Sequence, residues 1–147
     1  MDIKAALMEP KTWVTVGSVV LMLILGLGPL MTGLEGGTDH ADSEHSELME
    51  SLSEEDKEAF VDVVNQELFV FGVWNVTICL MFLAMVNLTD GETQAKLAMV
   101  AAASMILISG IGSYQVNGDA YFMEWVTLSA ILAAPMLITG YMKLNAE

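Results

Sequence analysis

The sequence predicts an all-α integral membrane protein, built as a four-helix bundle with the N- and C-termini in the cytoplasm. Of its 147 residues, 54% are hydrophobic and only 16% are charged, whereas soluble domains average roughly 45–50% and about 25%. The apolar residues gather into four blocks at 13–33, 68–88, 95–115 and 121–142. Each block has the about 20 residues that a helix needs to cross a bilayer. We therefore treat residues 1–147 as a single membrane domain.

The first apolar block is predicted to remain in the membrane as an anchor. No charged residue lies between Lys11 and Glu35, and this run is longer than the apolar core of a secretory signal peptide, about 7–15 residues. No A-x-A cleavage site follows it. Pro29 is expected to bend or end this helix near the outer surface, because proline lacks a backbone donor.

Lysine placement predicts the orientation. All five cationic side chains are lysines, and cytoplasmic loops of membrane proteins are enriched in basic residues. An N-terminus inside the cell puts four of them in the cytoplasm: Lys4, Lys11, Lys96 and Lys143. Only Lys57 then lies outside, within the segment 34–66, which carries eleven acidic residues. We expect this arrangement in a prokaryotic cytoplasmic membrane.

The chain leaves the first span through a glycine-rich stretch. Gly33, Gly36 and Gly37 interrupt the apolar run, and residues 38–47 are polar without helical periodicity, which predicts a mobile acidic loop. The loop contains potential metal ligands, the candidates being His40, Asp42 and His45. Their spacing matches neither a zinc-finger nor an EF-hand ligand order, so a solvated charged loop without metal is the preferred interpretation.

A short amphipathic helix is predicted after this loop, as far as residue 67. Ser51 and Glu54 have capping-box spacing, and apolar residues recur behind them at helical intervals. No glycine or proline separates Glu54 from Phe71. The helix is therefore expected to run directly into the second span.

Polar and aromatic residues gather near the predicted outer ends of spans two, three and four. Spacings of seven and eight residues put Glu67, Trp74 and Asn75 on one helical face. If the spans pack as antiparallel neighbours, a pocket for a lipid headgroup, a quinone ring or another apolar molecule is predicted, with these members: Glu67, Trp74, Asn75, Tyr114, Gln115, Glu124 and Trp125. The alternative is that the aromatic residues mark the membrane interface. Asn75 is expected to need a hydrogen-bond partner on another helix.

Small residues and a proline mark the expected packing faces. Ala98, Ala102 and Gly110 let a neighbouring backbone approach span three closely, so this span is expected to be central. Pro135 is expected to kink span four. That helix is expected to finish at residues 139–140.

Several classes of function lack the residues that they need. A net charge of −14 without any arginine argues against nucleic-acid binding. Cys79 is the only cysteine, which excludes an intrachain disulfide and a thiolate metal cage. No ionisable side chain lies at mid-membrane depth, so neither a proton relay nor a site for a charged substrate is expected there.

The layout resembles that of the DoxX-like small membrane proteins, on two stretches: Glu67-Leu-Phe-Val-Phe-Gly-Val-Trp-Asn75 and the polar turn Thr89-Asp-Gly-Glu-Thr-Gln94. The resemblance covers most of the chain. It implies a four-span bundle with the N-terminus inside, a longer outer segment after span one, and a helix that leads into a glycine-containing span two. This chain lacks the basic position that some members carry in span three. Some members are associated with redox enzymes.

These features favour a non-catalytic accessory or assembly subunit of a larger membrane protein complex. Such a subunit would contact the lipid bilayer and other membrane proteins, and no nucleic acid. The alternative is a binder or carrier of a small apolar ligand, lipid or quinone at the outer pocket, and no other cofactor is suggested. An enzyme is the least favoured class, because the sequence shows no nucleophile–base pair and no cofactor motif.

Overall fold

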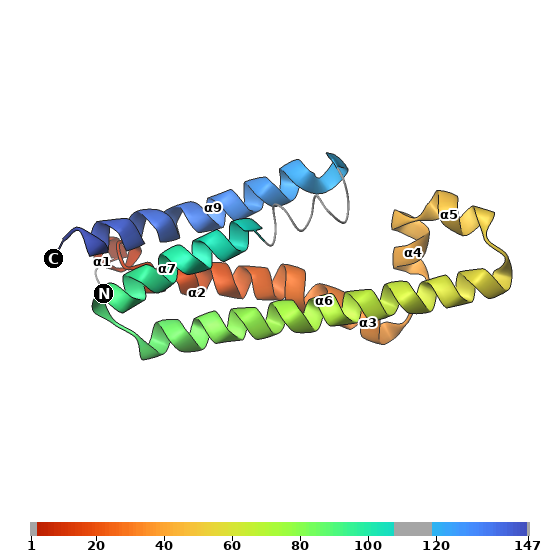
Figure 1. The fold of residues 1–147 in the computed structure, drawn as a ribbon, viewed down its shortest axis with the longest axis horizontal. Coiled ribbons are helices and arrows are strands. Elements are labelled where there is room, and N and C mark those ends of the chain that lie inside the picture. The colour runs from red at the N-terminus through yellow and green to blue at the C-terminus, as the bar shows by residue number, and fades with distance from the viewer. Residues whose placement is uncertain (1–2, 108–118, 147) are drawn as a thin grey trace. The chain divides into compact units, whose positions relative to one another are not determined.

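The computed structural model describes residues 3–107 and 119–146, except for the side chains of 119–125. Its regular elements are helices, as Figure 1 shows, and the prediction of an all-α protein is confirmed for the described residues. The chain divides into two compact units. The central unit consists of residues 20–79, and the terminal unit consists of residues 1–19 with 80–147.

Three helices in the described part are long and apolar enough to cross a membrane: Pro10–Glu35, Glu54–Leu88 and Val126–Leu144. In the most apolar 18-residue stretch of each helix, only 22–33% is buried inside the protein. Apolar surface of this extent is costly in water and is suited to lipid. These helices support the prediction of an integral membrane protein.

The third predicted span, 95–115, is only partly described. Its first part belongs to α7 (Gly91–Ile106), a helix of 16 residues. Residues 108–118 lie outside the described part, so this span stays a prediction as a whole.

The first candidate span is one helical run with a wider turn in its middle. α2 (Pro10–Leu21) passes into a π-helical turn, η1 (Met22–Leu27), and then into α3 (Gly28–Glu35). Pro29 lies two residues after the end of this turn, and its nitrogen carries no hydrogen to donate to the carbonyl four residues earlier. The helix does not end at Pro29, because the backbone accommodates the proline beside a π turn and continues to Glu35. That part of the expectation is wrong, and a bend at Pro29 stays a prediction.

The true end of this helix is Gly36, with a φ of +67°. Its N–H donates to the carbonyl of Thr32 at 3.3 Å, the left-handed cap that glycine adopts without a steric cost. Gly33, predicted to release the chain, lies inside α3 instead. A Cβ there would come within 2.5 Å of the Phe69 nitrogen, so this glycine lets two backbones approach each other.

α6 (Glu54–Leu88) is a single helix of 35 residues, as the absence of glycine and proline before Phe71 predicts. At 1.5 Å per residue it is about 50 Å long, and the hydrocarbon core takes up only about 30 Å. Its cap is two residues later than predicted. The Oγ of Ser53 accepts from the Asp56 N–H at 3.3 Å, while Ser51 donates to the Leu48 carbonyl.

Two short helices occupy the segment that was predicted to be a mobile loop. α4 (Asp39–Glu44) and α5 (Ser46–Ser51) are separated by His45, whose N–H donates to the Ala41 carbonyl at 2.9 Å and whose carbonyl accepts from the Met49 N–H at 2.9 Å. The apolar members of this segment were too few to show a period over ten residues. Ala41 on α4 and Met49 on α5 are nevertheless both buried, and they belong to the same apolar cluster.

In the terminal unit, α7 lies alongside α9 (Asp119–Leu144), as Figure 1 shows. Ala98 and Ala102 have no exposed surface, and a Cβ on Gly140 would come within 2.8 Å of the Ala95 carbonyl oxygen. Small residues thus let the two helices approach closely, as association in lipid requires. Gly110, the remaining member of the predicted packing face, lies outside the described residues.

Pro135 lies inside α9, and the helix continues beyond it to Leu144. The predicted end at residues 139–140 is therefore wrong. The Thr139 hydroxyl donates to the Pro135 carbonyl at 2.7 Å, a bond within one turn that keeps a polar side chain satisfied inside an apolar helix.

Candidate functional site

The acidic segment is folded around an apolar core of its own. We call residues 38–68 the acidic head; it comprises α4, α5 and the first part of α6. Its core is formed by buried side chains on all three helices, with two partly buried neighbours: Ala41, Met49, Val61, Val64, Phe60 and Leu68. Because a core fixes helices relative to one another, the charges on the head keep defined positions.

The outer surface of the head is almost uniformly negative. It carries eleven acidic side chains, all of them exposed: Asp39, Asp42, Glu44, Glu47, Glu50, Glu54, Glu55, Asp56, Glu58, Asp62 and Glu67. Lys57 is the only cation, and its Nζ lies 2.8 Å from an Oε1 of Glu54. Exposed like charges on a rigid support create a field that attracts cationic surfaces.

The three candidate metal ligands come from α4 and from the residue that follows it. The ring of His45 stands against that of Phe60 in an edge-to-face arrangement, with centroids 5.4 Å apart and planes at 81°. His40 and Asp42 belong to α4. Across the described ranges, no group of three or more His, Cys, Asp or Glu side chains is placed to hold a metal ion.

The predicted outer pocket is described only on α6. Trp74 is 64% exposed and Glu67 is exposed as well. Tyr114 and Gln115 lie outside the described residues, and the side chains of Glu124 and Trp125 on α9 are not described. The pocket therefore stays a prediction.

Among the members of that set that the structure describes, Asn75 is the buried one, with 7% of its surface exposed. Its Nδ2 donates to the Phe71 carbonyl, one turn earlier in the same helix, at 2.8 Å. The expectation that this amide group needs a partner on another helix is therefore corrected. A helix can satisfy such a donor with its own backbone, and this removes the need for a polar neighbour.

A polar cluster that the sequence analysis missed lies in the terminal unit. The Nζ of Lys143, in the last turn of α9, is 2.7 Å from an Oε2 of Glu9 and 3.5 Å from the Oε1 of Gln94. Gln94, on α7, is only 6% exposed. Its Nε2 donates to the carbonyls of Val86 and Thr89 at 3.1 and 2.9 Å.

This cluster connects four chain segments at one end of the terminal unit. Gln94 joins the end of α6 to the start of α7, and Lys143 joins both to Glu9, the residue before α2. Each of these residues looks like an ordinary polar residue near the end of a span. Only contacts between residues as far apart as 134 positions reveal them as a group.

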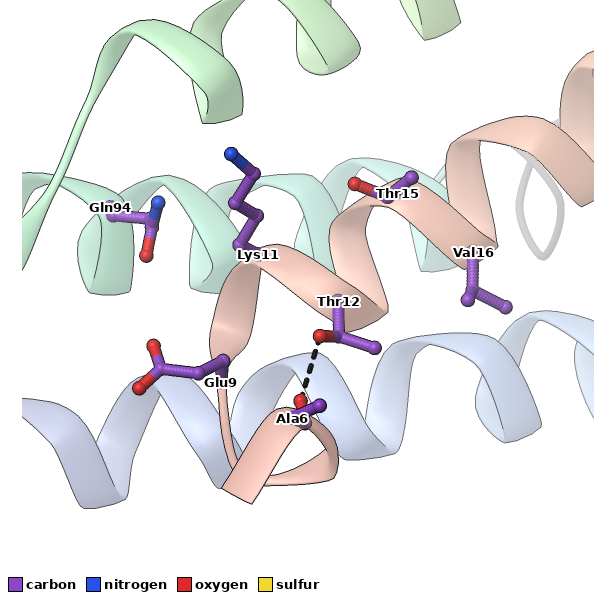
Figure 2. Close-up of a pocket in the computed structure, with 7 residues that line it drawn as sticks. All are labelled: Ala6, Glu9, Lys11, Thr12, Thr15, Val16 and Gln94. Atoms are coloured by element: carbon purple, nitrogen blue, oxygen red, sulfur yellow. Dashed lines mark hydrogen bonds between the residues drawn. The ribbon is translucent and has the colours of Figure 1, made fainter. Parts of the chain in front are cut away.

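A groove of about 440 Å³ lies beside this cluster. It is lined by seven residues from the start of the chain and from α7, drawn in Figure 2: Ala6, Glu9, Lys11, Thr12, Thr15, Val16 and Gln94. α1 (Ile3–Leu7) forms one of its edges. Two α2 side chains hold α1 in place, since Thr12 donates to the Ala6 carbonyl at 2.7 Å and Trp13 to the Leu7 carbonyl at 2.8 Å.

One ion pair at the start of α7 perturbs a carboxyl group. Lys96 pairs with Glu92, one turn earlier. The hydrogen bond and the charge of Lys96 lower the pKa of the Glu92 carboxyl below its ordinary value. Both side chains are exposed, so this pair is a surface feature of the helix start.

No protein-family model, no curated protein sequence and no solved structure matches this chain. The class of this protein therefore rests on its own residues. They form a helical chain with three candidate membrane spans in its described part.

Proposed function

We propose that this chain is a non-catalytic accessory subunit of a membrane protein complex, and that the acidic head docks a partner with a basic surface. The observation that supports the proposal is the folding of the head on its own core. A free acidic loop would lose conformational entropy on binding. A surface held by α4, α5 and α6 has already lost that freedom in the free protein.

The charge pattern supports the same proposal. All eleven carboxylates of the head point to solvent, and its single cation is already paired with Glu54. Complementary potentials speed association and select the partner. The apolar faces of the spans, which this protein leaves uncovered, provide surface for lipid and for partner helices.

Purification in mild detergent at low salt tests this function. We expect a stoichiometric partner to copurify, and to be released in about 1 M salt, where the Debye length falls to about 3 Å. The double variant Glu47→Gln, Glu50→Gln should retain less of the partner. The matched control, Asp90→Asn with Glu92→Gln, makes the same change in net charge outside the head. A monodisperse lone species at low salt would contradict the proposal.

We also propose that the chain crosses the membrane four times with both termini in the cytoplasm. This is supported by the Lys143 contacts, which bring the starts of α2 and α7 and the end of α9 to one end of the terminal unit. The chain must cross an even number of times between points on the same side. One pair of crossings then comes before α7, and the second comprises α7 with its continuation and α9.

Labelling with a membrane-impermeant maleimide tests this topology. In a Cys79→Ala background, Ser43→Cys should be labelled in intact cells, and Ala146→Cys only after lysis. Labelling of both positions in intact cells would contradict the four-span arrangement. The DoxX-like layout rests on the same arrangement, together with the helix that leads into α6, and it would fail with it.

A further inference from the structure

Most polar groups that line the groove beside α2 already have partners. The Thr12 hydroxyl donates to the Ala6 carbonyl. Gln94 uses its Nε2 for two carbonyls and its Oε1 for Lys143. The carboxylate of Glu9 is neutralised by Lys143 at 2.7 Å. None of these groups needs a ligand.

Two polar groups remain. Among the described residues, Lys11 forms no ion pair and the Thr15 hydroxyl makes no hydrogen bond. The two residues are one turn apart, so their side chains share a face of α2. Figure 2 shows both on the same side of that helix, with Thr12 and Ala6 on the other. The groove therefore presents one uncompensated positive charge and one free hydroxyl.

The surroundings of these two groups are apolar. The groove lining is mostly carbon, contributed in part by Ala6 and Val16. Ile3, Leu7 and Met8 lie just before α2 and are 68%, 46% and 46% exposed. Exposed apolar residues beside a lysine, at the start of a membrane-spanning helix, are typical of the lipid–water interface. A ligand that suits this groove has an anionic head and an apolar body.

We infer that the groove binds an anionic phospholipid, whose headgroup phosphate is held by Lys11 and Thr15. The ammonium group supplies a charge-assisted hydrogen bond to a phosphate oxygen, and the hydroxyl donates a second. The acyl chains lie against Val16 and the apolar surface of α2. Zwitterionic lipid is bound less well, because its own ammonium group competes with Lys11 for the phosphate.

Native mass spectrometry tests this inference on the full chain, released from nanodiscs that contain equal amounts of phosphatidylglycerol and phosphatidylcholine. We expect the protein to retain phosphatidylglycerol in preference. Lys11→Gln should reduce that preference about fivefold, the effect of one lysine near a membrane surface. Lys11→Arg should preserve it, and Thr15→Val should reduce it by a smaller factor.

Lys96→Gln is the matched control, because it removes the same charge from an exposed lysine that pairs with Glu92 and does not line the groove. The inference is overturned if Lys11→Gln keeps the wild-type preference, or if Lys96→Gln loses as much. It is also overturned if inorganic phosphate displaces phosphatidylglycerol from the solubilised protein as effectively as added lipid, because the site would then accept free phosphate. A species with the mass of two chains that retains neither lipid would also overturn it, because a second copy of the chain would then cover the groove.

Discussion

Replacing Gly72 by alanine tests the close approach of two helices in the central unit. A Cβ at this position would lie 2.5 Å from the Leu30 nitrogen and 2.7 Å from the Gly26 carbonyl oxygen. Both are backbone atoms, which cannot move aside as a flexible side chain can. Ordinary contacts begin at 3.4 Å, so α6 and the η1–α3 segment would have to separate by about 1 Å along this direction.

The separation should lower the free energy of unfolding by about 1–3 kcal/mol, the usual cost of overpacking a well-packed site. The measurement is helix content against sodium dodecyl sulfate concentration, in mild-detergent micelles. Gly28→Ala is the matched control, because its nearest neighbour would be 3.9 Å away and the backbone is helical there as well. Equal midpoints for the two variants would refute the close packing of these helices.

Met49→Ala should destabilise the acidic head by about 2–5 kcal/mol, measured as faster hydrogen exchange over residues 39–51. Leu48→Ala, at a position that is 44% exposed, should leave the exchange unchanged. Equal exchange in the two variants would contradict the core of the head. Gln94→Ala should lower the free energy of unfolding by about 1–3 kcal/mol, because two main-chain carbonyls lose their donor; an unchanged stability would show that these bonds are replaced by water. The pKa of the Glu92 carboxyl, followed by NMR, should be below its ordinary value and return to it in Lys96→Met. Because that pKa is lowered by folding, the stabilisation is complete above the unfolded-state pKa and is lost as the pH falls through the folded-state pKa; an identical titration in Lys96→Met would refute the pairing.

Features that depend on nearby residues could be predicted well. Long apolar runs predicted the spans at 13–33 and 68–88, and the structure has membrane-length helices there. The continuity of α6 followed from the residues that it lacks. Several local predictions failed, among them the helix end at Pro29 and the loop at residues 38–47. In both places the chain forms more helix than its own residues favour, because packing on α6 stabilises it.

The groups that bear on function could not be predicted in the same way. Gln94, Lys143 and Glu9 come from three distant parts of the chain, and no spacing relates them. Asn75 was predicted to reach a second helix, but rotation about its side chain brings the amide to its own backbone. Such choices depend on the geometry of individual side chains, which a pattern of residue types does not contain.

The sequence by itself determined that this chain forms long apolar helices suited to lipid and an acidic segment suited to water. Transfer into a bilayer depends on the summed hydrophobicity of one continuous segment, and that sum can be read from consecutive residues. Only the tertiary structure decided that the acidic segment has a core, that glycines bring α3 and α6 together, and that Lys11 remains uncompensated beside an apolar groove. Those outcomes depend on which side chains meet across the fold, because partners satisfy some polar groups and leave others free.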